Sequence, residues 1–186
     1  MELDRERMAE IGKYSKAYQA PDYKMGERRR AAAMPLLHDA PSRRSYLDVG
    51  CGRGEMLDEA RGLGFERIEG TEVVPDLLAR DLVRFALAHK LPYTEQEFDI
   101  VTCMDVLEHL IPQDTVPVLK ELDRITNVQL IVSANNKQSR SMGMELHVNK
   151  RPYHEWDQLI RGYTSGDVCW ISKGKGELSE TWVITK

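Results

Sequence analysis

A glycine-rich segment at residues 48–54 constrains the fold of this chain more than any other feature. Its sequence is DVGCGRG, so glycines stand at positions 50, 52 and 54. The segment follows the apolar run SYLDV at 45–49 and precedes the helix-forming run EMLDEARG at 55–62. A strand, a turn almost without side chains and a helix in this order predict either a tight bend or a backbone that approaches a ligand closely.

Two familiar phosphate-binding patterns do not fit these glycines. A phosphate-binding P-loop requires Lys and then Ser or Thr after the last glycine, where this chain has Glu55 and Met56. A dinucleotide fingerprint has its third glycine three positions after the second, which here is Glu55. An acidic side chain there would repel a diphosphate, so a nucleoside with a different polar tail remains.

The rest of the chain alternates between strand-like and helix-like segments. Such alternation predicts right-handed crossovers and a parallel sheet covered on both faces. We therefore predict one α/β domain with a Rossmann-like, doubly wound sheet of seven strands, mainly parallel, with an antiparallel C-terminal hairpin closed at 174–177. We expect helices at 4–19, 24–38, 54–64, 75–81, 115–125 and 152–160, and strands at 45–50, 67–74, 82–86, 98–107 (running into a helix start), 128–134, 167–173 and 181–186.

Composition narrows the class of protein. The three cysteines, Cys51, Cys103 and Cys169, are odd in number and lack C-x-x-C spacing, which argues against a disulfide framework and a structural zinc site. No apolar run reaches membrane-spanning length, and the first residues, MELDRERMAE, are too charged for a secretion signal. We expect a cytoplasmic protein without a membrane partner. Its net charge is −4, with an acidic middle and basic flanks.

Four landmarks occur in order along the chain: LDVGCGRG at 47–54, IEGTEVVPDLL at 68–78, LPYTEQEFDIVTCMDVLEHL at 91–110, and the terminal hairpin. Together they resemble the class I S-adenosylmethionine-dependent methyltransferases, in particular type 11/12-like members with an L-E-H triplet. The resemblance implies S-adenosyl-L-methionine as cofactor and S-adenosyl-L-homocysteine as product. It spans residues 44–186, and residues 1–43 are expected to form N-terminal helices that cap the site.

The same resemblance implies a set of cofactor-binding residues. The glycine backbone is expected to meet the methionyl carboxylate and ammonium, and Glu72 is expected to accept hydrogen bonds from the ribose hydroxyls. Leu87 departs from the acid that the family often has there, which leaves its two neighbours to contact the adenine. The expected cofactor-binding residues are Asp48, Gly50, Cys51, Gly52, Gly54, Glu72, Val73, Leu87, Ala88, His89, Met104 and Asp105, with Tyr23 and Arg28 closing over the cofactor.

Three residues are expected to carry catalysis on the acceptor side. His109 ends the L-E-H triplet and is a candidate general base, although it equally suits a structural hydrogen bond. Tyr14 and Tyr18 share one face of the first predicted helix, and Tyr18 is the second candidate. His147, the third, lies in a long polar insertion at 135–156. Sequence spacing predicts no metal site.

We therefore expect methyl transfer to oxygen or nitrogen of a small-molecule or glycan-like acceptor. Three alternatives stay open: a nucleic-acid or protein methyltransferase that uses the basic flanks, a catalytically inactive S-adenosylmethionine-binding regulatory subunit, and a nicotinamide-dependent oxidoreductase. Nucleic acid is not indicated as a partner, because the isoelectric point is about 5.8. The chain is expected to be a monomer or a homodimer.

Overall fold

A seven-stranded sheet organises the computed structural model, which describes residues 2–20, 27–171 and 180–186 and, for 2–3 and 27–32, only the backbone. The strand order is β3-β2-β1-β4-β5-β9-β8. The first five strands pair in parallel, and β9 runs antiparallel to both of its neighbours. The predicted α/β fold is thereby confirmed, with strands β1 Ser45–Val49, β2 Arg67–Glu72, β3 Val83–Phe85, β4 Phe98–Met104, β5 Thr126–Ala134, β8 Asp167–Ile171 and β9 Glu180–Thr185.

Strand β1 lies between β2 and β4, and it is the point of the sheet from which successive strands are added on either side. The chain leads from β1 outward to β2 and β3 on one side, and then returns to β4 and continues to β5 on the other side of β1. The carboxyl ends of these parallel strands meet at one edge, and ligands of open α/β sheets bind where the strand order reverses in this way. The glycine loop, defined here as residues 50–54, follows β1 at this edge.

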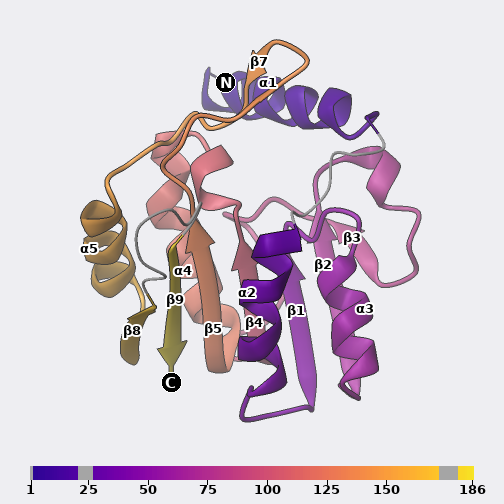
Figure 1. Ribbon diagram of the computed structural model, residues 1–186, viewed down its shortest axis with the longest axis vertical. Coiled ribbons are helices and arrows are strands. Elements are labelled where there is room, and N and C mark those ends of the chain that lie inside the picture. Colours follow the sequence, from indigo (N-terminus) through magenta and orange to yellow (C-terminus); the bar gives the residue numbers. More distant parts are fainter. Residues whose placement is uncertain (1, 21–26, 172–179) are drawn as a thin grey trace.

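Helices cover both faces of the sheet (Figure 1). Helices α2 (Glu27–His38) and α3 (Glu55–Gly62) pack on one face, where Leu37 and Leu57 are fully buried. On the other face lie α4 (Thr115–Ile125) and α5 (Tyr153–Tyr163), with Leu119 and Trp156 in the core. Strand β4 is buried along its whole length, as expected for a central parallel strand.

Helix α1 (Glu2–Ala17) takes a different position from the other helices. It crosses the edge where the parallel strands end, and in Figure 1 it lies at the top, above the arrowheads of β1, β2 and β5. Arg7 on α1 forms two hydrogen bonds to the carboxylate of Asp114, at 2.7 and 2.6 Å. The described part of α2 packs on the sheet instead, so the first two helices differ in place. The division of the chain at residue 43 stays a prediction.

Several predicted elements differ in extent from those observed. The helix expected at 75–81 is only a single 3-10 turn, η1 (Pro75–Leu77). The carbonyl of Leu82 accepts a hydrogen bond from the Gly70 N–H at 2.8 Å, so the chain must already be extended at the start of β3. The insertion at 135–156 holds a short hairpin, β6 (Arg140–Ser141) and β7 (Met144–Glu145). The connection at 174–177 lies outside the described residues.

Two further 3-10 turns, η2 (Leu107–His109) and η3 (Pro112–Asp114), connect β4 to α4. They carry the L-E-H triplet to the same edge of the sheet as the glycine loop. Among the described residues, no helix is both long and apolar enough to cross a membrane.

Candidate functional site

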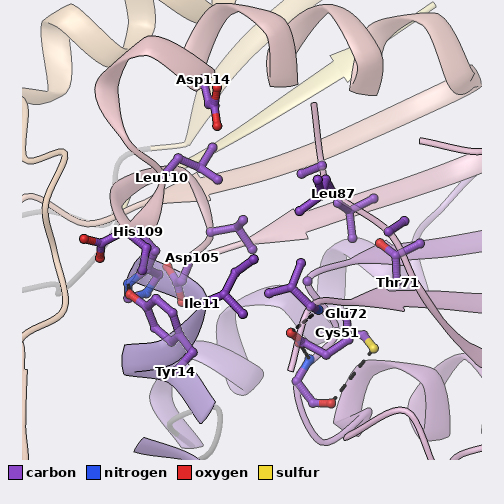
Figure 2. Close-up of a pocket in the computed structure, with 18 of the residues that line it drawn as sticks. Ile11, Tyr14, Cys51, Thr71, Glu72, Leu87, Asp105, His109, Leu110 and Asp114 are labelled. Carbon is purple, nitrogen blue, oxygen red and sulfur yellow. Dashed lines mark hydrogen bonds between the residues drawn. The ribbon is translucent and has the colours of Figure 1, made fainter. Parts of the chain in front are cut away.

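A pocket lies between the carboxyl edge of the sheet and α1 (Figure 2). The glycine loop forms part of its wall, and Gly50, Cys51 and Gly52 all line it. Gly50, Gly52 and Gly54 have φ angles of +74°, +55° and +82°, which are left-handed conformations that favour glycine. A Cβ atom on Gly52 would stand 2.6 Å from the hydroxyl of Tyr18 on α1. Both the bend and the closeness of α1 therefore require glycine here.

Glu72, at the end of β2, fastens the glycine loop from the neighbouring strand. One carboxylate oxygen accepts the Gly52 N–H at 2.9 Å, and the other accepts the N–H groups of Val73 at 2.6 Å and Val74 at 3.1 Å. Burial raises the pKa of Glu72, while these backbone donors oppose the rise. Glu72 and Val73 also line the pocket. Glu72 thus lines the pocket and holds the loop, and its contact with a ribose stays a prediction.

Asp48 lies behind the glycine loop rather than in the pocket wall. Its side chain is buried, and Oδ1 accepts a hydrogen bond from the Thr102 hydroxyl at 2.7 Å. Tyr46 extends this buried chain, with its hydroxyl 2.7 Å from the oxygen of Thr102. Burial raises the pKa of Asp48 to about 7. The predicted role in orienting the loop stays a prediction.

The segment that follows β3 closes one side of the pocket. Leu87, Ala88 and His89 all line it, and their contact with an adenine ring stays a prediction. The imidazole of His89 lies 3.7 Å from the carboxylate of Asp114, the residue that also holds Arg7. Burial lowers the pKa of His89 despite that carboxylate, which favours the neutral ring.

The end of β4 contributes a strained residue to the pocket wall. Asp105 has a φ angle of +56°, and both Met104 and Asp105 line the pocket. The Ser133 hydroxyl accepts the Asp105 N–H and donates to its Oδ1, each at 2.9 Å. These bonds hold Asp105 in a left-handed conformation that non-glycine residues seldom adopt, and such residues concentrate at functional sites.

Tyr14, His109 and His147 gather across the pocket from Glu72; we call them the Tyr–His cluster. Tyr14 comes from α1 and His109 from η2, and their rings meet edge to face, with centroids 4.9 Å apart (Figure 2). His147 comes from the insertion after β7, and its ring centroid lies 4.6 Å from that of His109. Tyr14 and His109 line the pocket. Three segments distant in sequence therefore meet here.

Hydrogen bonds attach α1 to the pocket at several points. The Tyr14 hydroxyl donates to the carbonyl of Leu146 at 2.8 Å and contacts Nδ1 of His109. Arg53 of the glycine loop donates to the carbonyls of Tyr18 and Ala20 at 2.9 and 3.1 Å. Together with the pairing of Arg7 and Asp114, these contacts hold α1 over the carboxyl edge.

The structure brings most of the predicted site residues together, including Tyr18, which lines the pocket. Asp48, Gly54 and His147 are not among the residues that line it. Gly54 caps the start of α3, and His147 reaches the site through His109. Tyr23 and the side chain of Arg28 lie outside the described part of the chain.

Sequence reasoning gave no role to Glu108 and did not include Tyr14 among the site residues. Glu108 is fully buried, and one ligand-type atom from each of Glu108, His109 and His147 lies within 4.8 Å of the others. The L-E-H triplet and the four-residue spacing of Tyr14 and Tyr18 were visible signals. No signal in the sequence indicated that His147 would contact His109, which lies 38 positions earlier.

Comparison with known proteins identifies a family. The sequence profile of a family described as "Methyltransferase domain" matches residues 22–165, more than half of the chain. No curated protein matches the sequence.

Solved structures share the fold at low identity. The 1,6-didemethyltoxoflavin-N1-methyltransferase of Burkholderia thailandensis, crystallised with 1,6-didemethyltoxoflavin and S-adenosylhomocysteine, is 19% identical with a TM-score of 0.71, covering 98% of this chain and 90% of its own. A Pyrococcus horikoshii OT3 protein is 18% identical with a TM-score of 0.69, covering 88% and 92%. An S-adenosylmethionine-dependent methyltransferase of Mesorhizobium loti is 11% identical with a TM-score of 0.65, covering 85% and 98%. At these identities the likeness is one of fold.

Proposed function

The chain belongs to the methyltransferase domain family as a class I, S-adenosylmethionine-dependent enzyme, and from this premise we propose that it methylates an oxygen or nitrogen atom of a small-molecule acceptor. The observation that carries the proposal is the pocket itself. One of its sides is built from the glycine loop and Glu72, and the other from Tyr14 and His109 of the Tyr–His cluster. A cofactor held by the first side presents its sulfonium methyl group to an acceptor held by the second.

The cofactor is proposed to lie along the glycine loop. The backbone at Gly50 and Gly52 can approach the methionyl group because no side chain intervenes. Glu72 and residues 87–89 line the pocket, which supports the proposal that the Glu72 carboxylate accepts from the ribose hydroxyls and that residues 87–89 contact the adenine. Since Glu72 also binds the Gly52 N–H, ribose and loop are positioned by one carboxylate.

Methyl transfer then proceeds as an in-line displacement. An acceptor lone pair forms a bond to the methyl carbon while the carbon–sulfur bond breaks, and the thioether leaves with the bonding electrons. Orientation of two reactants in a closed pocket supplies up to about 7–11 kcal/mol of such a barrier. Helix α1, attached by Arg7, Tyr14 and contacts from Arg53, provides the closure.

His109 is proposed to take the proton that the acceptor releases. Its Nδ1 faces the Leu146 carbonyl at 3.1 Å and contacts the Tyr14 hydroxyl, an arrangement that places the ring proton on Nδ1. The lone pair is then on Nε2, the atom that can act as a base. Tyr18 and His147 are proposed to complete the catalytic group, Tyr18 from the pocket wall and His147 by positioning His109.

Release of S-adenosylhomocysteine from S-adenosylmethionine, followed across a panel of phenols, amines and sugar-like hydroxyl compounds, tests the proposal. We expect turnover with at least one class. His109→Asn should lower turnover at least about 10-fold, while the affinity for S-adenosylhomocysteine changes less than twofold. The matched control is His38→Gln, an exposed histidine on α2, which should leave both unchanged. Cofactor binding without transfer to any acceptor would favour a regulatory subunit, and transfer only to nucleic acid or protein would overturn the small-molecule assignment.

A further inference from the structure

We propose that Glu108, His109 and His147 bind a divalent transition-metal ion beside the acceptor end of the pocket. One donor atom from each residue lies within 4.8 Å of the other two. Donors bound about 2.0–2.2 Å from an ion lie about 3.3–3.6 Å from one another in tetrahedral geometry. Side-chain rotations that move each donor atom by about an ångström would therefore bring the three atoms to bonding distance.

The orientation of His147 suits a metal ligand. Its Nδ1 lies 2.6 Å from the carbonyl of Lys137, to which it donates. This bond fixes the tautomer and leaves the lone pair on Nε2, the nitrogen that would coordinate an ion. Metal-bound histidines usually donate their other ring N–H to a carbonyl or carboxylate in this way.

His109 is oriented by the same kind of contact. Its Nδ1 lies 3.1 Å from the carbonyl of Leu146 and contacts the hydroxyl of Tyr14. That hydroxyl donates to the Leu146 carbonyl, so its oxygen is turned to accept the Nδ1–H. Both imidazoles thus carry their lone pairs on Nε2, and the carbonyls of Lys137 and Leu146 hold the two rings.

Backbone contacts hold the two segments that carry the donors against each other. The N–H of Asn149 donates to the carbonyl of Glu108 at 3.0 Å. The Asn149 side chain donates to the carbonyl of Leu107 at 3.0 Å and to the Thr115 hydroxyl at 2.9 Å. The L-E-H turn and the strand-like segment around His147 therefore form one rigid support, as a metal site with defined geometry requires.

The donor set selects the kind of ion. Two neutral imidazoles and one carboxylate suit Mn²⁺, Fe²⁺, Co²⁺, Ni²⁺ or Zn²⁺, whereas Mg²⁺ and Ca²⁺ prefer oxygen donors. Glu108 is fully buried, and its carboxylate supplies the oxygen donor of the set. Three protein donors leave at least one coordination position for another molecule.

The catalytic use of the ion rests on the proposed function. His109 both belongs to the donor set and lines the pocket, so an open coordination position would face the acceptor. An acceptor hydroxyl bound there loses its proton to water more readily, because the ion stabilises the oxyanion. When the ion is bound, the ion and not His109 activates the acceptor, and an oxygen acceptor is favoured over a nitrogen acceptor.

Titration of Co²⁺ into the full chain, stripped with EDTA and free of cofactor and acceptor, tests the site directly. We expect one equivalent per chain, with visible d–d absorption typical of nitrogen and oxygen donors, and a higher melting temperature with Zn²⁺. His147→Gln and His109→Asn should each weaken Co²⁺ binding at least about 10-fold. His38→Gln, an exposed histidine outside the cluster, should bind as the unaltered chain does.

Circular dichroism of each variant separates loss of the site from loss of the fold. If His147→Gln unfolds, His109→Asn tests the site in its place. Failure of the stripped chain to bind Co²⁺ would overturn the site. Binding of Co²⁺ by both cluster variants as tightly as by the unaltered chain would overturn it too. Metal binding without methyl transfer would leave the site standing and count against the proposed function. Methyl transfer unchanged by EDTA would overturn the catalytic use of the ion.

Discussion

The two sides of the pocket are built by different means. The side formed by the glycine loop and Glu72 is largely backbone, and the carboxylate at the end of β2 accepts an N–H that follows β1 and an N–H that follows β2 itself. The Tyr–His cluster consists of side chains from three segments, namely α1, η2 and the insertion after β7. A site made of backbone depends little on which side chains surround it, whereas a site made of side chains from three segments depends on the identity and placement of each of them.

A bulky residue in the glycine loop should produce the largest effect, confined to the backbone side of the pocket. Gly52→Val forces a β-branched residue into a left-handed φ of +55° and places atoms against Tyr18. The conformational cost of about 1–2 kcal/mol adds to the loss of ligand space. We expect affinity for S-adenosylhomocysteine, measured by calorimetry, to fall at least about 100-fold.

Gly64→Val is the matched control for that substitution. Gly64 has a φ of +79° at the end of α3, and a Cβ atom there meets nothing within 4 Å. The control should lose stability and keep its affinity for S-adenosylhomocysteine. Equal losses of affinity in both variants would mean that backbone strain, and not contact with the ligand, explains the result.

Glu72 should produce the next largest effect. Glu72→Gln keeps the shape of the side chain but turns an NH₂ group toward one of the backbone donors that the carboxylate now accepts. We expect cofactor binding to weaken by about 1–3 kcal/mol, with a smaller loss of stability. Exposed Glu66→Gln should change neither. Retained affinity in Glu72→Gln would remove the carboxylate from the proposed ribose contact.

The contrast between the two sides explains what the sequence could predict. The glycine loop was recognisable because left-handed φ angles restrict positions 50, 52 and 54 to glycine, and that restriction is visible in one sequence. The mainly parallel, doubly wound sheet followed from the alternation of strand-like and helix-like segments. The meeting of His147 with His109 depends on how the insertion folds back, and no local pattern encodes it. The helix predicted at 75–81 was too long, because the chain turns again at Arg80, whose carbonyl accepts the Val83 N–H at 3.0 Å, and this turn brings β3 alongside β2.

Loosening α1 should act mainly on the side-chain half of the pocket. Arg7→Gln removes a two-bond pairing with the buried carboxylate of Asp114. Because Arg7 is partly exposed, we expect a loss of about 1–2 kcal/mol in the free energy of unfolding and a raised KM for the acceptor. Affinity for S-adenosylhomocysteine should change less than about threefold.

Arg61→Gln provides the comparison, since Arg61 and Asp58 form an exposed pair at 3.6 Å. Urea unfolding of that variant should differ by less than about 0.5 kcal/mol. If Arg7→Gln lowers cofactor affinity as much as Glu72→Gln does, α1 supports both sides of the pocket and the contrast between them is lost.

Asp48 should have the smallest effect on ligand binding and a clear effect on pH dependence. Its pKa of about 7 in the folded chain lies above the ordinary value near 3.9. At pH values between these two, the folded state holds a proton that the unfolded state has released. The stabilisation is complete below about pH 4 and declines, by at most about 1.4 kcal/mol per pH unit, until the pH passes about 7.

Urea unfolding between pH 4 and 8 checks this expectation. Asp48→Asn keeps the oxygen that accepts from Thr102 and cannot ionise, so its stability should vary less with pH. Exposed Asp76→Asn should follow the unaltered chain. A profile for Asp48→Asn as steep as that of the unaltered chain would place the titrating group elsewhere.

A crystal structure of the chain with S-adenosylhomocysteine tests the central claim most directly. We expect the ribose against Glu72, the adenine beside residues 87–89, the amino-acid tail over the glycine loop, and the sulfur facing His109. A nucleoside bound elsewhere, or one whose ribose avoids Glu72 while its sulfur points away from the Tyr–His cluster, would contradict the division of the pocket into a cofactor side and an acceptor side.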